Sequence, residues 1–278
     1  MENPLLPGSI GVFDSGYGGL TILREFRKRL PDYDYLYLGD NARAPYGTRS
    51  FELVYRFTLQ AVSELFRRGC NLVILACNTA SAKALRSIQQ NDLPGIDPRK
   101  RVLGVIFPTV ESLGALSASR HVGLLGTPGT VASHSYALET AKLFPDIKVT
   151  EMACPMWVPL VEHGEADGDG ADYFVKKYIS QLLDSNPKID TIVLGCTHYP
   201  LLYDKIRKYT PADITIVAQG ALVADSLADY MRRHPEIDNA CSRGGSVKYL
   251  TTENAGKFAS LGSLFMNDDI AAEKVTLF

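Results

Sequence analysis

Short apolar runs alternate with longer amphipathic stretches along this chain. The runs are rich in Val, Ile and Leu, which predicts buried β-strands. Between them, Leu20, Leu23, Phe26 and Leu30 recur at helical spacing, and a similar apolar face spans residues 51–65. Strands that alternate with helices in this way are typical of an α/β fold with parallel sheets. The expected strands cover residues 9–13, 34–38, 71–76, 102–105, 121–125, 147–152, 190–195 and 214–217.

Two of these strands run into nearly identical sequences. Residues 72–79 read LVILACNT and residues 191–198 read TIVLGCTH, so each strand ends in a small residue, a cysteine and then amide or hydroxyl groups. In sheets of this kind, ligands bind at the carboxyl ends of the strands. Cys77 and Cys196 therefore suggest a site assembled from two halves, with one sulfur on each side. That geometry suits an acid and a base acting on opposite faces of one carbon, as racemisation requires.

A weaker repeat surrounds this pair. Residues 10–15, IGVFDS, resemble residues 122–127, VGLLGT. Buried parallel strands resemble one another by chance, but the ordered matches favour two related lobes. We expect two pseudo-symmetric α/β lobes, each with a mainly parallel sheet flanked by helices, and an active site between them. The expected lobes are residues 1–101 plus 213–278, and residues 102–212; the tail, 247–278, belongs to neither repeat and is expected to pack on the first lobe.

Composition and charge limit the function classes. The 278 residues are 46% hydrophobic and 22% charged, with a net charge of −2, which gives no electrostatic basis for a nucleic-acid or membrane partner. No apolar run approaches the roughly 20 residues of a membrane span. Residues 1–13 lack the basic region and cleavage site of a signal peptide. We therefore expect a cytoplasmic protein.

The cysteines divide into two groups. A lone cysteine is often a small buried hydrophobe, whereas the shared context of Cys77 and Cys196 favours reactive thiols. His198 follows Cys196 by two residues and is either a proton carrier or structural. Neither the cysteines nor the five histidines show metal-ligand spacing, so no metal site is expected. The cysteines expected to be merely buried are Cys70, Cys154 and Cys241.

The loop after the first expected strand, residues 14–19, reads DSGYGG and opens a helix. Its backbone N–H groups are suited to an anion, and Asp14 is suited to an ammonium group. The alternative is a tight turn with Asp14 as a helix cap. The loop is neither a Walker motif nor a dinucleotide fingerprint, because Thr21 stands where the third glycine is needed.

Other loops supply weaker candidates. Pro45, Tyr46 and Gly47 form a predicted turn that lines the same crevice, and Asp40 either acts there or pairs with Arg43. In the second lobe, the hydroxyls of Thr127 and Thr130 are suited to a substrate carboxylate or to helix capping. Glu162 either supports a catalytic base or is an acid at a helix start.

Several motifs together resemble the glutamate racemases of the aspartate/glutamate racemase family. The match follows essentially the whole chain, and aspartate and hydantoin racemases usually lack this combination. The motifs are DSGYGGL at 14–20, RAPYG at 43–47, ACNTA at 76–80, ACP at 153–155, LGCTHYP at 194–200 and the Thr-Thr tail at 251–258.

The resemblance implies an isomerase that interconverts L- and D-glutamate without a cofactor and supplies D-glutamate for peptidoglycan. It implies that Cys77 exchanges the proton on the D-glutamate side and Cys196 that on the L-glutamate side. Asp14 then serves Cys77 and His198 serves Cys196, with Asp40 and Glu162 as support. A homodimer is the expected assembly. The implied substrate contacts are Asp14, Ser15, Tyr46, Gly47, Asn78, Thr79, Thr197 and His198.

The sequence leaves three points open. Trp157 is bulkier than expected beside the ACP motif, which leaves the shape of the pocket wall undefined. A cysteine hydrolase built on Cys196 and His198 is a second interpretation, but it leaves the copy at Cys77 unexplained. A two-lobed amino-acid binding protein is a third, and the absence of a signal peptide argues against its periplasmic form.

Overall fold

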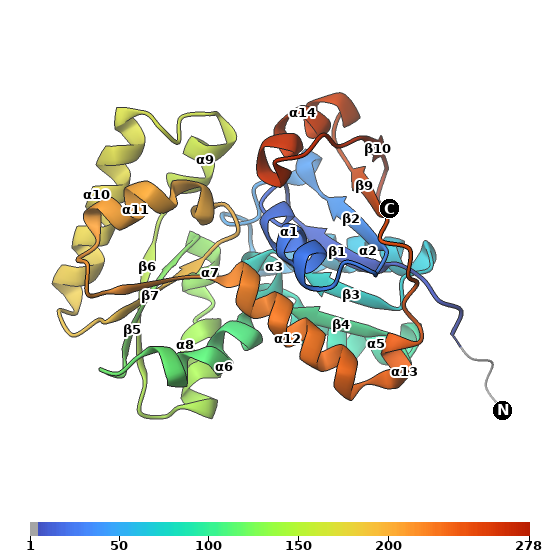
Figure 1. The fold of residues 1–278 in the computed structure, drawn as a ribbon, viewed down its shortest axis with the longest axis horizontal. Helices are drawn as coiled ribbons and strands as arrows, with labels where there is room; N and C mark the ends of the chain where they lie inside the picture. Colours follow the sequence, from blue (N-terminus) through green and yellow to red (C-terminus); the bar gives the residue numbers. More distant parts are fainter. Residues whose placement is uncertain (1–4) are drawn as a thin grey trace.

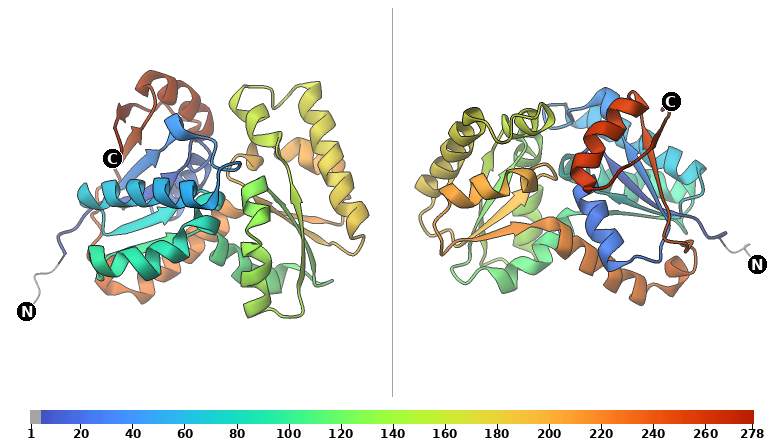
Figure 2. Two further views of the ribbon diagram at one scale, coloured as in Figure 1. Left: turned by 180° about the vertical axis from the view of Figure 1, so that it is seen from behind. Right: turned by 45° about the horizontal axis from the view of Figure 1, so that its top comes forward.

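The computed structural model describes residues 5–278, which form two α/β lobes side by side (Figures 1 and 2). All strand pairs in its two sheets are parallel. The fold class and the positions of the eight predicted strands are confirmed. These strands are β1 (Ile10–Asp14), β2 (Tyr35–Gly39), β3 (Leu72–Leu75), β4 (Arg101–Gly104), β5 (His121–Gly126), β6 (Lys148–Ala153), β7 (Thr191–Gly195) and β8 (Thr215–Ala218).

The two sheets repeat one another in strand order. The first sheet has the order β10-β9-β2-β1-β3-β4 and the second has the order β6-β5-β7-β8. Without its two added strands, the first sheet matches the second strand for strand. Cys77 follows β3 and Cys196 follows β7, so the two cysteines occupy equivalent positions at the carboxyl edges of the two sheets.

Helices cover both faces of the first sheet. Along β1, Ile10 and Val12 pack in one hydrophobic cluster and Phe13 packs in another, because successive strand residues point to opposite faces. The first cluster includes side chains of α1 (Leu20–Arg29), α12 (Gln219–Arg233) and α14 (Ala255–Met266). The second includes side chains of α2 (Phe51–Arg67), α3 (Asn78–Lys83), η2 (Ile88–Asp92) and α5 (Leu93–Ile96).

The second sheet is covered in the same way. One face packs against α9 (Trp157–Glu162), α10 (Asp169–Ser185) and α11 (Tyr203–Tyr209), and the other against α6 (Ile106–Leu116) and α8 (Ser135–Leu143). The remaining short elements are η1 (Asn41–Arg43), α4 (Leu85–Ser87), α7 (Pro128–Ala132), η3 (Tyr199–Leu202) and α13 (Pro235–Asp238).

The tail packs on the first lobe, as predicted. Strand β9 (Val247–Thr251) lies beside β2, with Tyr37 opposite Tyr249, and β10 (Ala272–Lys274) extends the sheet. Helix α14 then lies against α1. The tail therefore completes the sheet that carries Cys77.

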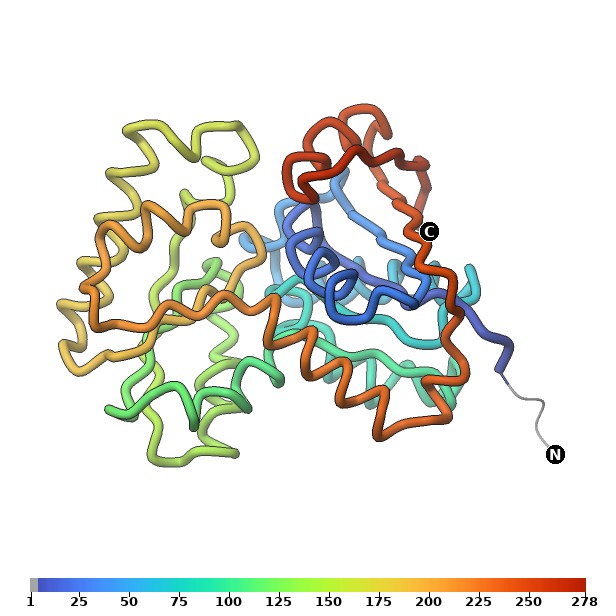
Figure 3. The backbone as a smooth tube through the Cα atoms, viewed as in Figure 1, coloured from blue at the N-terminus to red at the C-terminus, as the bar shows by residue number. Residues whose placement is uncertain are grey.

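The chain passes between the lobes twice, after β4 into α6 and after β8 into α12 (Figure 3). The expected boundaries differ from these passages by one strand each. β4 pairs with β3 and so belongs to the first sheet, whereas β8 pairs with β7 and belongs to the second. We therefore propose lobe boundaries near residues 105 and 219 in place of 102 and 213.

The sequence predicted no membrane span, and none of the helices within residues 5–278 has the length and apolar character to cross a bilayer. Residues 1–4, which begin the segment read for a signal peptide, lie outside the described part of the chain.

Candidate active site

Cys77 lies at the start of α3 and is almost fully buried. The Ala80 backbone N–H donates to its Sγ at 3.5 Å, so the cysteine itself caps the helix. The Ser15 hydroxyl lies 3.4 Å from the same sulfur. Ser15 comes from the loop after β1, the strand that neighbours β3. Adjacent strands thus bring the serine and the thiol together.

The surroundings of Cys77 favour its neutral thiol. Burial and the negative charge of Asp14 raise the pKa of Cys77 to about 12, although the hydrogen bonds from Ser15 and Ala80 act in the opposite direction. A buried thiolate without a nearby cation is costly. Cys77 is therefore a neutral thiol at neutral pH.

Cys196 has a different neighbour. Nδ1 of His198 lies 3.9 Å from its Sγ, and Nε2 of the same ring lies 3.0 Å from Oε1 of Glu162. Burial alone lowers the pKa of His198, but its hydrogen bonds to Cys196 and Glu162 raise it to about 10. The imidazole is therefore positively charged at neutral pH. The three residues form a line from the carboxylate through the cation to the sulfur.

Asp14 lies between the two half-sites. Its Oδ1 accepts a hydrogen bond from the Gly16 N–H at 2.8 Å, and the Thr197 hydroxyl lies 3.5 Å from Oδ2. Burial raises the pKa of Asp14, whereas the charge of His198 lowers it. The influence of Asp14 on Cys77 is electrostatic, and the hydrogen-bonding partners of that sulfur are the Ser15 hydroxyl and the Ala80 N–H.

The glycine loop packs tightly on the second cysteine's loop. A Cβ on Gly18 would lie 2.1 Å from Oγ1 of Thr197 and 2.5 Å from Nδ1 of His198, so a larger residue has no space there. The Thr21 hydroxyl is within 3.1 Å of the Thr197 carbonyl. The close approach of the two loops therefore requires a glycine at position 18.

Three threonine hydroxyls meet where the lobes touch. Oγ1 of Thr79 is 2.9 Å from that of Thr127 and 3.3 Å from that of Thr130, and the last two are 3.1 Å apart. Thr127 also caps α7 by accepting from the Thr130 N–H. Helix capping is thus confirmed for Thr127, and binding of a substrate carboxylate by these hydroxyls stays a prediction.

Tyr46 and Asp40 act as a unit. The Tyr46 hydroxyl donates to Oδ2 of Asp40, which also pairs with Arg43 at 2.7 Å, while Thr252 donates to Oδ1 at 2.9 Å. The Asp40 carboxylate is fully buried and its oxygens are occupied, so it anchors Tyr46. The Gly47 carbonyl accepts from Gly129 of the second lobe at 2.7 Å.

Asn78 belongs to a buried network that the sequence did not reveal. Its side-chain amide forms hydrogen bonds with Gln219 and Tyr136. Gln219 immediately follows a strand, and that position was a signal that could have identified it. Tyr136 lies in α8 and carried no such signal.

Trp157 does not line the site. It is fully buried in the second lobe, with its ring centroid 4.7 Å from that of Tyr199. Trp157 therefore fills the core of the second lobe and does not form part of the pocket wall. The three remaining cysteines are buried, as predicted: Cys70, Cys154 and Cys241.

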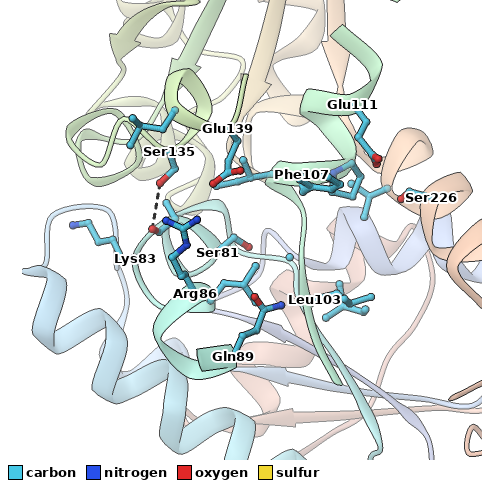
Figure 4. A pocket seen from close by; sticks show the side chains of 18 of the residues that line it. Ser81, Lys83, Arg86, Gln89, Leu103, Phe107, Glu111, Ser135, Glu139 and Ser226 are labelled. Carbon is cyan, nitrogen blue, oxygen red and sulfur yellow. Dashed lines mark hydrogen bonds between the residues drawn. The ribbon is translucent and has the colours of Figure 1, made fainter. Parts of the chain in front are cut away.

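Two cavities lie near the junction of the lobes. One of about 260 Å³ is lined by Cys196, Thr197 and Gln219 among others. A larger one of about 760 Å³ lies among α3, α4, β4, α6, α8 and α12, where Lys83, Arg86 and Glu139 line it (Figure 4). Neither Cys77 nor Cys196 lines this larger cavity. Among residues 5–278, no cluster of three or more acidic, cysteine or histidine side chains is arranged to hold a metal ion.

Comparison with known proteins agrees with the predicted resemblance. The family model described as Asp/Glu/Hydantoin racemase matches residues 20–226. A glutamate racemase of Ruegeria sp. (strain TM1040) is 44% identical over 275 residues, covering 95% of this chain and 99% of that protein. The chain therefore belongs to the Asp/Glu/Hydantoin racemase family of isomerases.

Solved structures point to one branch of that family. A glutamate racemase isoform from Bacillus anthracis superposes with a TM-score of 0.88 at 32% identity, covering 97% of this chain and 98% of that one. The glutamate racemase from Francisella tularensis, solved with D-glutamate, has a TM-score of 0.85 at 32% identity and 97% coverage of both chains. The resemblance to glutamate racemases is thus confirmed.

Proposed function

We propose that this enzyme interconverts L- and D-glutamate by proton transfer between the α-carbon and two cysteines, without a cofactor. One observation carries the proposal: Cys77 and Cys196 follow equivalent strands of two matching sheets, and their partners differ in charge. The choice of glutamate rests on the relatives that bear this name.

In the direction from L- to D-glutamate, the Cys196 thiolate removes the α-proton, and the C–H bond electrons stay on the carbon. The Cys77 thiol then gives its proton to the opposite face. The products are D-glutamate, a Cys196 thiol and a Cys77 thiolate. The His198 cation supplies the counter-charge for a thiolate at Cys196, and the neutral thiol of Cys77 is the form that the donor needs. The reverse reaction uses the same steps in the opposite order.

The carbanionic transition state needs stabilisation, because the α-proton is only weakly acidic. Hydroxyls and backbone N–H groups directed at the substrate carboxylate would provide it. Ser15 and Thr79 lie on the Cys77 side, and Thr197 lies on the Cys196 side. Closure of the lobes would exclude water and strengthen these interactions.

In this proposal, the positive and negative groups of the substrate bind to different side chains. The Asp14 carboxylate receives the ammonium group, and hydroxyl and amide groups receive the carboxylates. Asp40 acts through Tyr46, and Glu162 acts through His198. The proposed contacts are Asp14, Ser15, Tyr46, Gly47, Asn78, Thr79, Thr130, Thr197 and His198.

The wider role follows from the activity. We propose a cytoplasmic enzyme that supplies D-glutamate for peptidoglycan and works as a homodimer, with no nucleic-acid or membrane partner. D-Glutamate released in the cytoplasm is available to enzymes that build cell-wall precursors.

The test is to incubate the purified enzyme with each enantiomer of glutamate and of aspartate, and to follow optical rotation. Solutions of L-glutamate and of D-glutamate should both lose their optical rotation. Aspartate should react at least about 100-fold more slowly if the site requires the longer side chain. C70A should behave as the wild type, because Cys70 precedes β3 whereas Cys77 follows it. Unchanged rotation of both glutamate enantiomers would exclude the proposed activity.

A further inference from the structure

A closed ring of hydrogen bonds joins the two lobes directly beside Cys77. Nδ2 of Asn78 donates to Oε1 of Gln219 at 2.7 Å, and Nε2 of Gln219 donates to the Tyr136 hydroxyl at 2.6 Å. That hydroxyl donates to Oδ1 of Asn78 at 2.6 Å, which closes the ring. All three residues are at most 3% exposed, so water does not compete for these bonds.

In the structure the ring runs in one direction. The single proton of Tyr136 is donated to Asn78, so toward Gln219 the hydroxyl can only accept. Likewise, Thr109 donates its proton to the Val105 carbonyl at 2.8 Å and accepts from Nε2 of Gln219 at 2.8 Å. Both protons and the oxygen of the Gln219 amide are therefore occupied. With Asn78 and the two hydroxyls as they stand, flipping the Gln219 amide alone would set its oxygen against two oxygens whose protons point elsewhere.

Gln219 also occupies a special place in the chain. It is the first residue of α12 and directly follows β8, at one of the two passages between the lobes. With Cys196 and Thr197 it lines the 260 Å³ cavity. The Gln219 side chain thus bonds to Asn78, the residue after Cys77, and lines the same cavity as Cys196.

We propose that Gln219 is a positioning residue that fixes the start of α3 against the second lobe, and so sets the placement of Cys77 relative to Cys196. The inference rests on the proposed two-cysteine reaction. A proton transfer between two groups on opposite faces of one carbon depends steeply on their separation, and a misplacement of about 1 Å can cost about 100-fold in rate. Gln219 therefore acts through Asn78 and does not itself exchange a proton.

The test compares Q219L with Y136F. Q219L removes every bond of the amide, and we expect kcat to fall about 100-fold with a smaller rise in KM. Y136F keeps the bond between Asn78 and Gln219, and we expect a fall of about tenfold. Y136F preserves the shape of the core and carries the test alone if Q219L does not fold. Y35F is the matched control, since the Tyr35 hydroxyl is also buried and bonds only within the first lobe, and it should keep wild-type kcat.

Alkylation by iodoacetamide, followed at each cysteine by mass spectrometry, separates positioning from loss of structure. We expect Q219L and Y136F to change the alkylation rate of Cys77 at least about threefold, while Cys70 and Cys241 stay protected as in the wild type. The inference is overturned if kcat of both variants stays within threefold of wild type. It is also overturned if Cys70 and Cys241 become reactive in parallel with Cys77, because that result indicates general loosening.

The same data distinguish this inference from the function on which it rests. If C77A and C196A abolish racemisation while both network variants retain wild-type kinetics, only the role of Gln219 fails. If C77A keeps wild-type racemisation, the two-cysteine reaction itself fails.

Discussion

The two half-sites share a plan and differ in charge. Each cysteine follows the third strand of its repeat, yet Cys77 is bonded to a neutral serine hydroxyl and a backbone N–H, whereas Cys196 lies beside a charged imidazole. The neighbouring carboxylates also differ: Asp14 acts on Cys77 without a cation between them, and Glu162 reaches Cys196 only through His198. Two matching sheets thus hold one thiol in its neutral form and place a cation beside the other.

This difference explains how one site can serve two mirror-image substrates. A symmetric pair of thiols would have no preferred resting state. Under the proposed assignment, the neutral thiol of Cys77 is the form that donates a proton when L-glutamate is converted into D-glutamate. The reverse reaction starts from a Cys77 thiolate, so under that assignment Cys77 must first lose its proton.

The largest effect should come from removing either sulfur. We expect C77A and C196A each to lower kcat/KM by at least about 1,000-fold, since each removes a group that transfers a proton in the transition state. The double variant should be no slower than the singles, because the two groups act as a unit. Steady-state polarimetry checks this, and additive losses would contradict two groups that act as a unit.

The next effect tests the asymmetry itself. We expect H198Q to lower kcat about 100-fold, because it removes the cation beside Cys196, and S15A to lower it less than about tenfold, because a backbone donor remains at Cys77. Equal losses in the two variants would show that the half-sites are not chemically distinct. Circular dichroism of both variants serves as the control for folding.

A smaller effect concerns the anchor of Tyr46. D40N keeps an acceptor but removes the charge that holds Arg43, so we expect the free energy of unfolding to fall by about 1–3 kcal/mol. The rate should fall only a few-fold, because Asp40 acts through Tyr46. Urea denaturation with a parallel activity assay measures both. A loss of activity as large as that of C77A would instead make Asp40 a direct participant.

The last effect is a pH dependence of stability. The folded protein raises the pKa of His198 from its usual 6.5 to about 10, so it binds that proton more tightly than the unfolded chain does. The resulting stabilisation is complete below about pH 6.5 and is lost as pH rises toward 10. The difference in unfolding free energy between wild type and H198Q should therefore shrink by at least about 1 kcal/mol between pH 6.5 and 9.5. A constant difference would contradict a charged His198.

The sequence predicted the features that are local along the chain. The strands before Cys77 and Cys196 are continuous apolar runs, and the shared pattern after them identified the pair. His198 was found because it lies two residues from its cysteine. The strand pairing was harder: an apolar run such as β4 or β8 does not encode its neighbour, so both lobe boundaries were placed one strand away.

Contacts between distant segments could not be derived in the same way. Glu162 was named as a support residue, but its bond to His198 depends on where α9 ends. Gln219 and Tyr136 were missed, because their bonds to Asn78 exist only when the two lobes meet. The tail strand β9 was also missed, although the tail's position on the first lobe was predicted.

The central claim is that two thiols on opposite faces each serve one enantiomer, and solvent deuterium tests it most directly. L-Glutamate is incubated with enzyme in D₂O, and the α-carbon label is measured by mass spectrometry in both enantiomers at early times. We predict that newly formed D-glutamate carries deuterium while the remaining L-glutamate keeps its original proton, with the mirror result from D-glutamate. If both enantiomers carry equal amounts of α-deuterium at early times, a single base reaches both faces of the carbon. That result would contradict the account.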